Sequence, residues 1–277
     1  MLAFADRLAA GRRTYVYLES PCNPHGYVLD VPGICRAAHG LNMRVILDAT
    51  VGTPFLTTPL QRPNSAERPD FVLHSYTKDL SGTGSVIAGV VIGRNEDMFL
   101  PKGESAGGIA WNDTLFWNVY YVKGAFLNAD AAFEVLQGLR TLEVRMLQHD
   151  CNGGVVAKFL AGHKKVKRVF YPGLPDHPQH ALAKRQMRGF GSMVTFETGS
   201  LRNAKKMLAR VGPVCSLGES LGGVETLISH PATMTHAALG VKGRAAIGIT
   251  DGMVRISVGI ENVEDIIADL EQALAAI

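Results

Sequence analysis

The sequence contains few cysteines, and their arrangement indicates neither disulfides nor a zinc site. Four occur in 277 residues, at positions without the paired spacing of zinc-binding motifs: Cys22, Cys35, Cys151 and Cys215. Sparse thiols in a chain of this size are typical of a reducing compartment. His177 and His180 form a short pair, but no cysteine or carboxylate cluster accompanies them, so no metal is expected. We therefore predict a cytoplasmic protein without disulfides or metal.

Charge and long hydrophobic runs are also scarce. Charged residues make up 19% of the chain, and the net charge is +3. The basic cluster at 164–168 has no interleaved aromatic residues, which favours a solvated surface over a nucleic-acid site. The longest apolar run, 86–92, is far shorter than the roughly 20 residues that cross a bilayer. Asp6 and Arg7 make the N-terminus unlike a signal peptide. Neither nucleic acid nor a membrane is expected as a partner.

Short apolar runs suggest a parallel sheet in the first half of the chain. Hydrophobic residues account for 47% of the sequence, enough for a large core. β-Branched runs at 14–18, 44–47, 71–75 and 86–92 predict buried parallel strands. A crossover helix is expected over 31–40, because Asp30 can cap it and Pro32 lies in its first turn.

The second half of the chain has a different pattern. A helix around Gly138, over 129–148, is expected to bridge two domains. Beyond it we predict a helix over 153–161, strands over 166–171, 193–196 and 254–258, and a last helix from Asn262. The glycine-rich stretch 103–108 is the main loop candidate, either a lid or an exposed insertion. The predicted fold is α/β, with a partial parallel-sheet domain at 1–147 and a smaller α+β domain at 148–277.

Polar residues follow three of the predicted strands at the points where the strands end. They are Glu19 and Asn23, then Asp48 and Thr50, then Ser75, Thr77 and Lys78. Since the carboxyl ends of parallel strands meet at one edge of a sheet, we expect these side chains to share a crevice. There, a lysine can form an imine with an aldehyde, hydroxyls can hold a phosphate, and a carboxylate can keep a pyridine nitrogen protonated. Pyridoxal phosphate needs all three of these groups in its binding site, and it is the predicted cofactor.

Ordered sequence blocks extend this interpretation along the chain. They are ESPCNP at 19–24, LDAT at 47–50, SYTK at 75–78, QGLRTL at 137–142, YPGLP at 171–175, ESLGGVETL at 219–227, HPATMTH at 230–236 and VRISVG at 254–259. With these blocks the chain resembles the Cys/Met-metabolism family of pyridoxal phosphate enzymes, which includes cystathionine γ-synthase, cystathionine γ-lyase, methionine γ-lyase and homoserine sulfhydrylases. The resemblance implies a fold-type I transferase-like architecture and a homotetramer built as a dimer of dimers.

The resemblance also implies roles for the cofactor site. Lys78 would bind the cofactor covalently and then move protons between substrate carbons. Asp48 would pair with the pyridinium nitrogen, and Asn23 would hydrogen-bond the ring oxygen. The hydroxyls of Thr50, Ser75 and Thr77 would complete the site, with Ser75 and Thr77 donating to the phosphate. Taken singly, Asn23 is equally consistent with a turn residue, and each hydroxyl with an ordinary strand end.

A substrate site is implied at the second half of the chain. Arg255 lies in an apolar strand pattern, which is costly for a permanent charge unless a carboxylate meets it. By the resemblance, Arg255 would bind the α-carboxylate of a small amino-acid substrate, assisted by Ser220 and Asn23. A structural ion pair with an internal acid is the alternative. Glu219 would receive the distal ammonium group of a cystathionine-like substrate, although an exposed loop glutamate explains it as well.

The implied activity is γ-elimination or γ-replacement on cystathionine, methionine or acylated homoserine. Two alternatives are a catalytically silent homologue that acts as an interaction partner and a pyridoxal phosphate-dependent aminotransferase. The first is motivated by the family's longer N-terminal segment with a phosphate loop, which we expect this chain to lack. Ala49 and Asp79 depart from the usual residues, and the region 94–124 is longer than is typical, so the substrate is left open.

Overall fold

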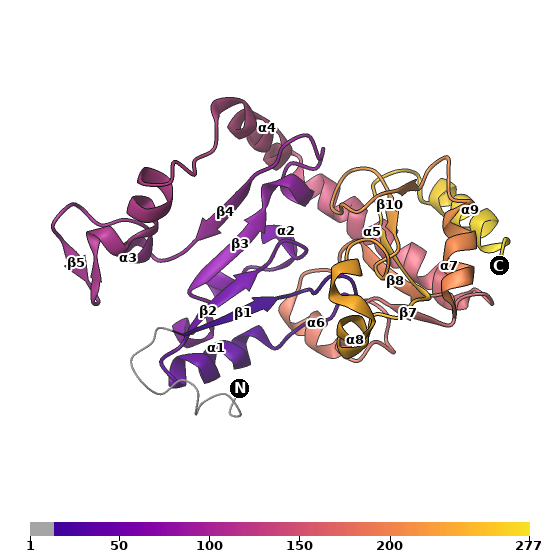
Figure 1. Cartoon of the computed structure of the whole chain (residues 1–277), viewed down its shortest axis with the longest axis horizontal. Coiled ribbons are helices and arrows are strands. Elements are labelled where there is room, and N and C mark those ends of the chain that lie inside the picture. Colours follow the sequence, from indigo (N-terminus) through magenta and orange to yellow (C-terminus); the bar gives the residue numbers. More distant parts are fainter. Residues whose placement is uncertain (1–13) are drawn as a thin grey trace.

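The computed structural model describes residues 14–277, in which a long helix joins a four-stranded and a five-stranded β-sheet (Figure 1). Asp6 and Arg7 lie outside the described residues. The first sheet has the order β1-β2-β3-β4. Its strands are β1 (Tyr15–Glu19), β2 (Arg44–Asp48), β3 (Phe71–Ser75) and β4 (Gly89–Ile92). They coincide within a few residues with the predicted runs.

The direction of the last strand differs from the prediction. β1, β2 and β3 are parallel, but β4 pairs antiparallel to β3, with Ser75 opposite Gly89. Residues 76–88 connect these two strands, and a parallel pair usually needs a crossover helix that runs back along the sheet. This connection contains only the lysine-bearing turn Tyr76–Leu80 and no such helix, and the chain returns alongside β3 in the opposite direction.

Helix α1 (Val31–Gly40) covers one face of this sheet and confirms the predicted crossover helix. The Asp30 side chain accepts a hydrogen bond from the Gly33 N–H and so caps the helix. The helix buries Val31, Cys35 and Ala38 against Val45, Leu47 and Val72.

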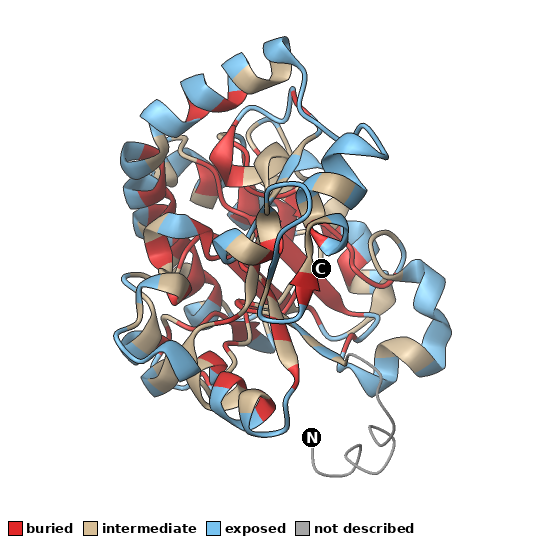
Figure 2. Cartoon of the chain, turned by 90° about the vertical axis from the view of Figure 1, so that its left-hand side faces the viewer, coloured by how far each residue is buried: buried red, intermediate tan, exposed pale blue. Residues whose placement is uncertain are grey.

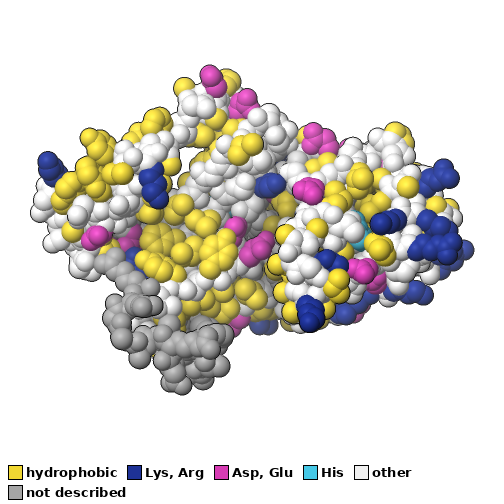
Figure 3. Space-filling view, viewed as in Figure 1, with side chains coloured by type: hydrophobic (Ala, Val, Ile, Leu, Met, Phe, Trp, Pro, Cys, Tyr) yellow, Lys and Arg dark blue, Asp and Glu magenta, His cyan; other side chains and the backbone are white. Residues whose placement is uncertain are grey.

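The opposite face of the sheet is uncovered within the described part of the chain. Tyr15, Tyr17 and Val91 are 44%, 60% and 40% exposed. Figure 3 shows hydrophobic side chains gathered over the sheet on this side. The prediction that all four strands are buried is therefore wrong for β1 and β4. The apolar composition of these strands indicates that their residues are suited to burial. Whether they are buried depends on which other element packs over them.

The segment after β4 extends away from both sheets (Figure 1). It contains α3 (Asn95–Met98) and a small hairpin of β5 (Ser105–Ala106) and β6 (Ile109–Ala110). The hairpin occupies the glycine-rich stretch for which a loop was predicted. Aromatic pairs order the remainder: the Phe116 and Tyr120 rings stack with centroids 5.2 Å apart, and those of Trp117 and Tyr121 are 4.7 Å apart.

The predicted bridging helix is two helices, α4 (Ala129–Arg140) and α5 (Leu142–Gly162). The break falls at Thr141, and the predicted helix over 153–161 is the second half of α5. Gly138 does not interrupt α4. A Cβ at this position would overlap the backbone of Leu80 and Ser81, so the glycine permits close packing of α4 on the turn after β3.

The second sheet has the order β7-β8-β11-β10-β9. Its strands are β7 (Arg168–Phe170), β8 (Met193–Glu197), β9 (Ser216–Leu217), β10 (Leu227–Ser229) and β11 (Met253–Ser257), all antiparallel to their neighbours except the pair β9 and β10. The sheet packs against α5, α7 (Leu201–Leu208) and α9 (Val263–Leu274). Short helices complete the fold: α2 (Thr53–Leu56), α6 (His180–Gln186) and α8 (Gly240–Ala246).

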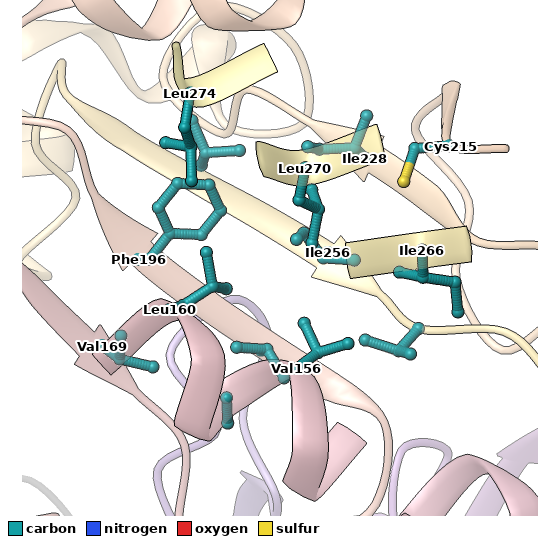
Figure 4. Close-up of a cluster of buried hydrophobic side chains, with 14 of the residues drawn as sticks. Val156, Leu160, Val169, Phe196, Cys215, Ile228, Ile256, Ile266, Leu270 and Leu274 are labelled. Atoms are coloured by element: carbon teal, nitrogen blue, oxygen red, sulfur yellow. The ribbon is translucent and has the colours of Figure 1, made fainter. Parts of the chain in front are cut away.

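The largest hydrophobic core lies between this second sheet and its helices (Figure 4). Val156 and Leu160 of α5, Phe196 of β8, Ile256 of β11 and Leu270 of α9 belong to this one cluster, in which Leu160 lies near the Phe196 ring. Buried residues occupy the interior where the helices and sheets meet (Figure 2). Helix α5 runs across the predicted boundary at 147/148, and it contacts both the turn after β3 and the strands β7 and β8 of the second sheet.

Within residues 14–277, no helix is both long and apolar enough to span a bilayer. In the same range, no three His, Cys, Asp or Glu side chains are grouped so that they could hold a metal ion. The four cysteines are free thiols.

Candidate active site

Lys78 lies in a turn at the carboxyl end of β3. The turn Tyr76–Leu80 is π-helical, and Lys78 itself departs from helical geometry with φ −90° and ψ −140°. Its Nζ donates a hydrogen bond of 2.8 Å to Ser220 Oγ. Burial lowers the pKa of Lys78, Arg255 lowers it further, and Asp79 opposes them. A lysine with a lowered pKa has a larger fraction of neutral amine, the form that attacks an aldehyde or accepts a proton.

Asp48 lies at the neighbouring strand end with its carboxylate held on both sides. Its Oδ1 accepts the Thr50 N–H at 3.0 Å, and its Oδ2 accepts the Tyr17 hydroxyl at 3.1 Å. Desolvation and the adjacent Asp48 carboxylate raise the pKa of Tyr17 to about 12, so the phenol remains a donor at neutral pH. The Thr50 hydroxyl in turn accepts the Ser75 N–H at 2.9 Å and ties the ends of β2 and β3 together.

The two hydroxyls expected at the phosphate have different surroundings. Thr77 Oγ1 donates to the Ala88 carbonyl at 3.4 Å and accepts the Ala88 N–H at 3.1 Å. It therefore closes the connection between β3 and β4. Ser75 Oγ makes no hydrogen bond within the described residues and is the freer donor of the two. Thr50 and Thr77 thus have structural bonds at positions where direct cofactor contacts were expected.

Arg255 of β11 is completely buried, as its position in an apolar strand suggested. Its Nη2 donates to the carbonyls of Glu219 and Ser220, both at 2.8 Å, and its Nη1 donates to Asn23 Oδ1 at 3.1 Å. Nε has no partner. No carboxylate among the described residues forms an ion pair with it, so the structure does not provide the internal acid of the alternative interpretation.

The electrostatics of Arg255 favour an anionic ligand. Burial lowers the pKa of Arg255 to about 10, with Glu219 opposing the shift, so the guanidinium stays charged at neutral pH. A buried charge without a paired opposite charge is costly, and a ligand carboxylate would supply the missing partner. The Glu219 side chain is exposed, and only its main-chain carbonyl contacts Arg255.

The loop that carries Asn23 leads from β1 to α1 and contacts residues of the second half of the chain. The Asn23 N–H donates to Glu19 Oε1 at 3.1 Å, which anchors the start of the loop at β1. Farther along, the Thr195 hydroxyl donates to the Pro24 carbonyl, and the His25 ring contacts the Gly248 carbonyl at 3.2 Å. Asn23 is therefore fixed between the two sheets, next to Arg255.

The structure brings Lys78, Ser220, Arg255 and Asn23 together through direct hydrogen bonds, while Asp48, Thr50 and Ser75 form a second connected group at the same sheet edge. The residues fit pyridoxal phosphate at its ring: an amine with a lowered pKa, a fixed carboxylate and an amide. A buried guanidinium with an unpaired Nε is next to them and suits a carboxylate. The phosphate end is represented by the Ser75 hydroxyl.

Sequence reasoning did not identify Tyr17 as a partner of Asp48. The available signal was the strand register. Tyr17 and Glu19 are two residues apart and lie on the same face of β1, and Glu19 pairs with Asp48. It also did not identify the packing of Arg145 and His149 beneath the lysine turn. Arg145 Nη1 donates to the Asp79 carbonyl at 2.6 Å, a contact between segments far apart in the chain.

Comparisons with known proteins show the family to which the chain is similar. The family model of the Cys/Met metabolism PLP-dependent enzymes matches residues 5–275. An L-methionine gamma-lyase of Fusobacterium nucleatum subsp. polymorphum is 43% identical over 263 residues, which is 95% of this chain and 62% of the relative. A cystathionine beta-lyase of Coxiella burnetii is 41% identical over 94% of this chain and 62% of its own length. The chain thus spans less than two thirds of these curated relatives.

Solved structures show the same similarity. The cystathionine gamma synthase of Xanthomonas oryzae pv. oryzae, in complex with aminoacrylate and cysteine, superposes with a TM-score of 0.86 at 37% identity, covering 99% of this chain and 66% of that structure. A cystathione gamma lyase (CalE6) of Micromonospora echinospora gives a TM-score of 0.85 at 35% identity, covering 98% and 66%.

Proposed function

The chain belongs to the Cys/Met-metabolism family of pyridoxal phosphate-dependent enzymes, and from this premise we propose that it acts as a carbon–sulfur lyase or γ-replacement transferase of sulfur amino acids. Its substrates in this proposal are cystathionine, methionine or an acylated homoserine. The relatives and structures named above are lyases and a synthase of this chemistry, which favours it over amino-group transfer.

One observation carries the proposal: Ser220 connects the lysine to the arginine. Its hydroxyl accepts the bond from Lys78 Nζ, and its carbonyl accepts a bond from Arg255 Nη2, both at 2.8 Å. A substrate whose α-carboxylate bound Arg255 would therefore have its α-carbon on the lysine side of the same residue. This arrangement is what proton removal at an α-carbon requires, because the base must lie within reach of the C–H bond in a fixed orientation.

The protein residues would divide the work as follows. Lys78 would hold the cofactor through its amine and later take and return protons at the substrate carbons, aided by its lowered pKa. Asp48, fixed by Tyr17 and Thr50, would face the ring nitrogen, and Ser75 would donate to the phosphate. When bound, the cofactor would supply an electron sink that makes removal of a proton from the substrate carbons feasible.

Substrate orientation would come from the second sheet. Arg255 would grip the α-carboxylate, with Asn23 and the Ser220 backbone holding the guanidinium plane in place. That Glu219 binds the distal ammonium group of a cystathionine-like substrate stays a prediction. Its side chain is exposed, and its backbone carbonyl contacts Arg255.

The first test is the visible absorption spectrum of the purified chain after addition of pyridoxal phosphate. We expect a band that is retained in Lys123→Ala, which removes an exposed lysine, and lost in Lys78→Ala. Borohydride reduction followed by peptide mass analysis should locate the label on Lys78. If the cofactor labels surface lysines and Lys78 equally, the proposed site is refuted.

The second test is a substrate screen on protein that shows the Lys78-dependent band. Release of a 2-oxo acid and a thiol from methionine or cystathionine indicates a lyase, whereas condensation of an acylated homoserine with cysteine indicates a synthase. If none of these substrates reacts while the band is present, the proposed activity is wrong and an interaction role is favoured. The cytoplasmic location and the dimer of dimers stay predictions.

A further inference from the structure

Arg145 of α5 is a buried cation that the proposed chemistry does not use. It is 6% exposed, and none of the ion pairs formed within residues 14–277 includes it. Burial lowers the pKa of Arg145, and the charge of Asp79 opposes this shift. An apolar side chain can often replace a buried charge without loss of stability, so a guanidinium at this position indicates a use for its donors.

The hydrogen bonds of Arg145 end on the lysine turn and on the helix junction behind it. Nη1 donates to the Asp79 carbonyl at 2.6 Å. Nη2 donates to the Leu80 carbonyl at 3.5 Å and to the Gly138 carbonyl at 2.8 Å. Nε donates to the Thr141 hydroxyl at 3.1 Å. The guanidinium therefore holds two successive carbonyls of the turn and ties them to the junction of α4 and α5.

The backbone of this turn is not held by a regular helix. Lys78 has φ −90° and ψ −140°, outside the helical region, so the hydrogen bonds of an α-helix do not fix the peptides next to it. Rotation about these two soft dihedrals would redirect the lysine side chain. The Lys78 carbonyl accepts the Gly82 N–H at 2.9 Å, and Arg145 holds the next two carbonyls. Three successive carbonyls are thus fixed at the base of the lysine.

The backbone also packs closely around the guanidinium. Gly82 has φ +77°, and a Cβ at this position would lie 2.5 Å from Arg145 Nη1. The Gly82 carbonyl accepts the Val224 N–H at 2.9 Å, which joins the turn to the loop that carries Ser220. At the other end of the side chain, Ser220 Oγ accepts the bond from Lys78 Nζ. Arg145 therefore holds the base of the lysine, and Ser220 holds its amine.

We propose that Arg145 is a positioning residue for Lys78. By holding the carbonyls of Asp79 and Leu80, it fixes the direction in which the lysine side chain leaves the turn, so that Nζ lies where the cofactor and the substrate α-carbon are to be met. A displacement of about 1 Å in such a group can lower a rate about 100-fold. The inference rests on the proposed function for the role of Lys78, but the placement of this amine can be measured without cofactor or substrate.

The experiment compares two reactions of the same lysine in Arg145→Met, which removes the donors and keeps an unbranched side chain. In cofactor-free protein, trace acetylation with acetic anhydride and peptide mass analysis gives the reactivity of Lys78 relative to the exposed Lys123. We expect this ratio to rise, because an amine released from Ser220 is more accessible to the reagent. The rate at which pyridoxal phosphate and borohydride label Lys78 should fall, because the amine must meet this aldehyde in one orientation.

Two control variants separate positioning from a general loss of stability. Leu160→Ala removes a completely buried side chain farther along α5, and should lower the free energy of unfolding without either change at Lys78. Arg140→Met removes an exposed arginine and should also leave both reactions unchanged. Thr141→Val removes only the hydroxyl that accepts from Arg145 Nε, and should give both changes to a smaller extent. This variant decides the question if Arg145→Met does not fold.

Kinetics give a further readout on protein that turns over a sulfur amino acid. Arg145→Met should lower kcat about 10- to 100-fold and leave KM close to the wild-type value, because the contacts of Arg255 are unchanged. The proposal is overturned if KM rises and kcat does not fall, if both reactions of Lys78 stay at wild-type rates, or if Leu160→Ala reproduces the two changes. Failure of every sulfur substrate while the acetylation ratio rises as expected would refute the proposed function and leave the positioning role of Arg145 standing.

Discussion

Asp269 of α9 offers a test of how the loop before Glu219 and Ser220 is held. The side chain is 3% exposed, and its two oxygens accept hydrogen bonds from the N–H groups of Gly212, Val214 and Cys215 at 2.7–3.0 Å. Burial alone would raise the pKa of Asp269, but the hydrogen bonds from Cys215, Gln272, Gly212 and Val214 outweigh it and keep the pKa below its usual value.

The magnitude of an Asp269→Asn change follows from these bonds. The amide has one oxygen, so two bonds to a charged acceptor become bonds to a neutral one, at a cost of about 1 kcal/mol each. The NH₂ group faces the Gly212 N–H and the Gln272 amide, which leaves a buried donor without an acceptor and costs about 1–3 kcal/mol more. We expect the free energy of unfolding to fall by about 3–5 kcal/mol at pH 7.

Urea unfolding of both proteins at several pH values tests this reasoning. Because the folded pKa lies below the unfolded one, the carboxylate contributes its full stability above the unfolded pKa of about 3.9. That contribution is lost as the pH falls through the folded pKa, so the two proteins should converge in acid. Asp265→Asn, on an exposed position of the same helix, should cost about 1 kcal/mol or less. A difference between wild type and Asp269→Asn that stays constant down to pH 3 would refute the argument.

Further expectations concern the site itself. Arg255→Lys keeps the charge but loses the planar fork, so amino-acid binding, followed by spectral titration, should weaken about 10- to 100-fold while cofactor binding is retained. Tyr17→Phe removes the hydroxyl from Asp48 and should weaken pyridoxal phosphate about 2- to 10-fold in an absorbance titration; an unchanged affinity would mean that the phenol does not support the carboxylate. Gly222→Ala, at φ +72° and in contact with the carboxylate after the lysine, should lower the free energy of unfolding by about 1–3 kcal/mol in urea, whereas Gly40→Ala, with open space around it, should change it by about 0.5 kcal/mol at most.

Local sequence signals account for the elements that were predicted correctly. Asp30 and Pro32 are at the positions a helix start requires, and α1 begins where they predict. The apolar run ending at Ser75 has polar residues directly after it, and β3 ends there. By contrast, β4 has strand composition, but its antiparallel direction depends on a connection from β3 without a crossover helix, and strand composition does not indicate direction.

The site divides in the same way. Lys78 and Arg255 are conspicuous in the sequence because one charge follows a strand end and the other lies within an apolar run. In the structure both side chains donate hydrogen bonds to the same residue, Ser220. The partnership of Tyr17 and Asp48 depends on strand register, and that of Asp79 and His149 on how α5 packs beneath a turn. Such contacts join residues far apart in the chain, and a single sequence does not specify them.

Helix α5 has a consequence for how the protein loses its structure. Arg145 near its start holds the backbone of the lysine turn, and Leu160 near its end lies in the core of the second sheet. A helix of 21 residues extends about 30 Å, so one continuous element connects both regions. Melting either sheet would therefore withdraw support from the other. Heating should produce a single calorimetric transition shared by both halves, and Lys78 should lose its environment at the same temperature as Arg255.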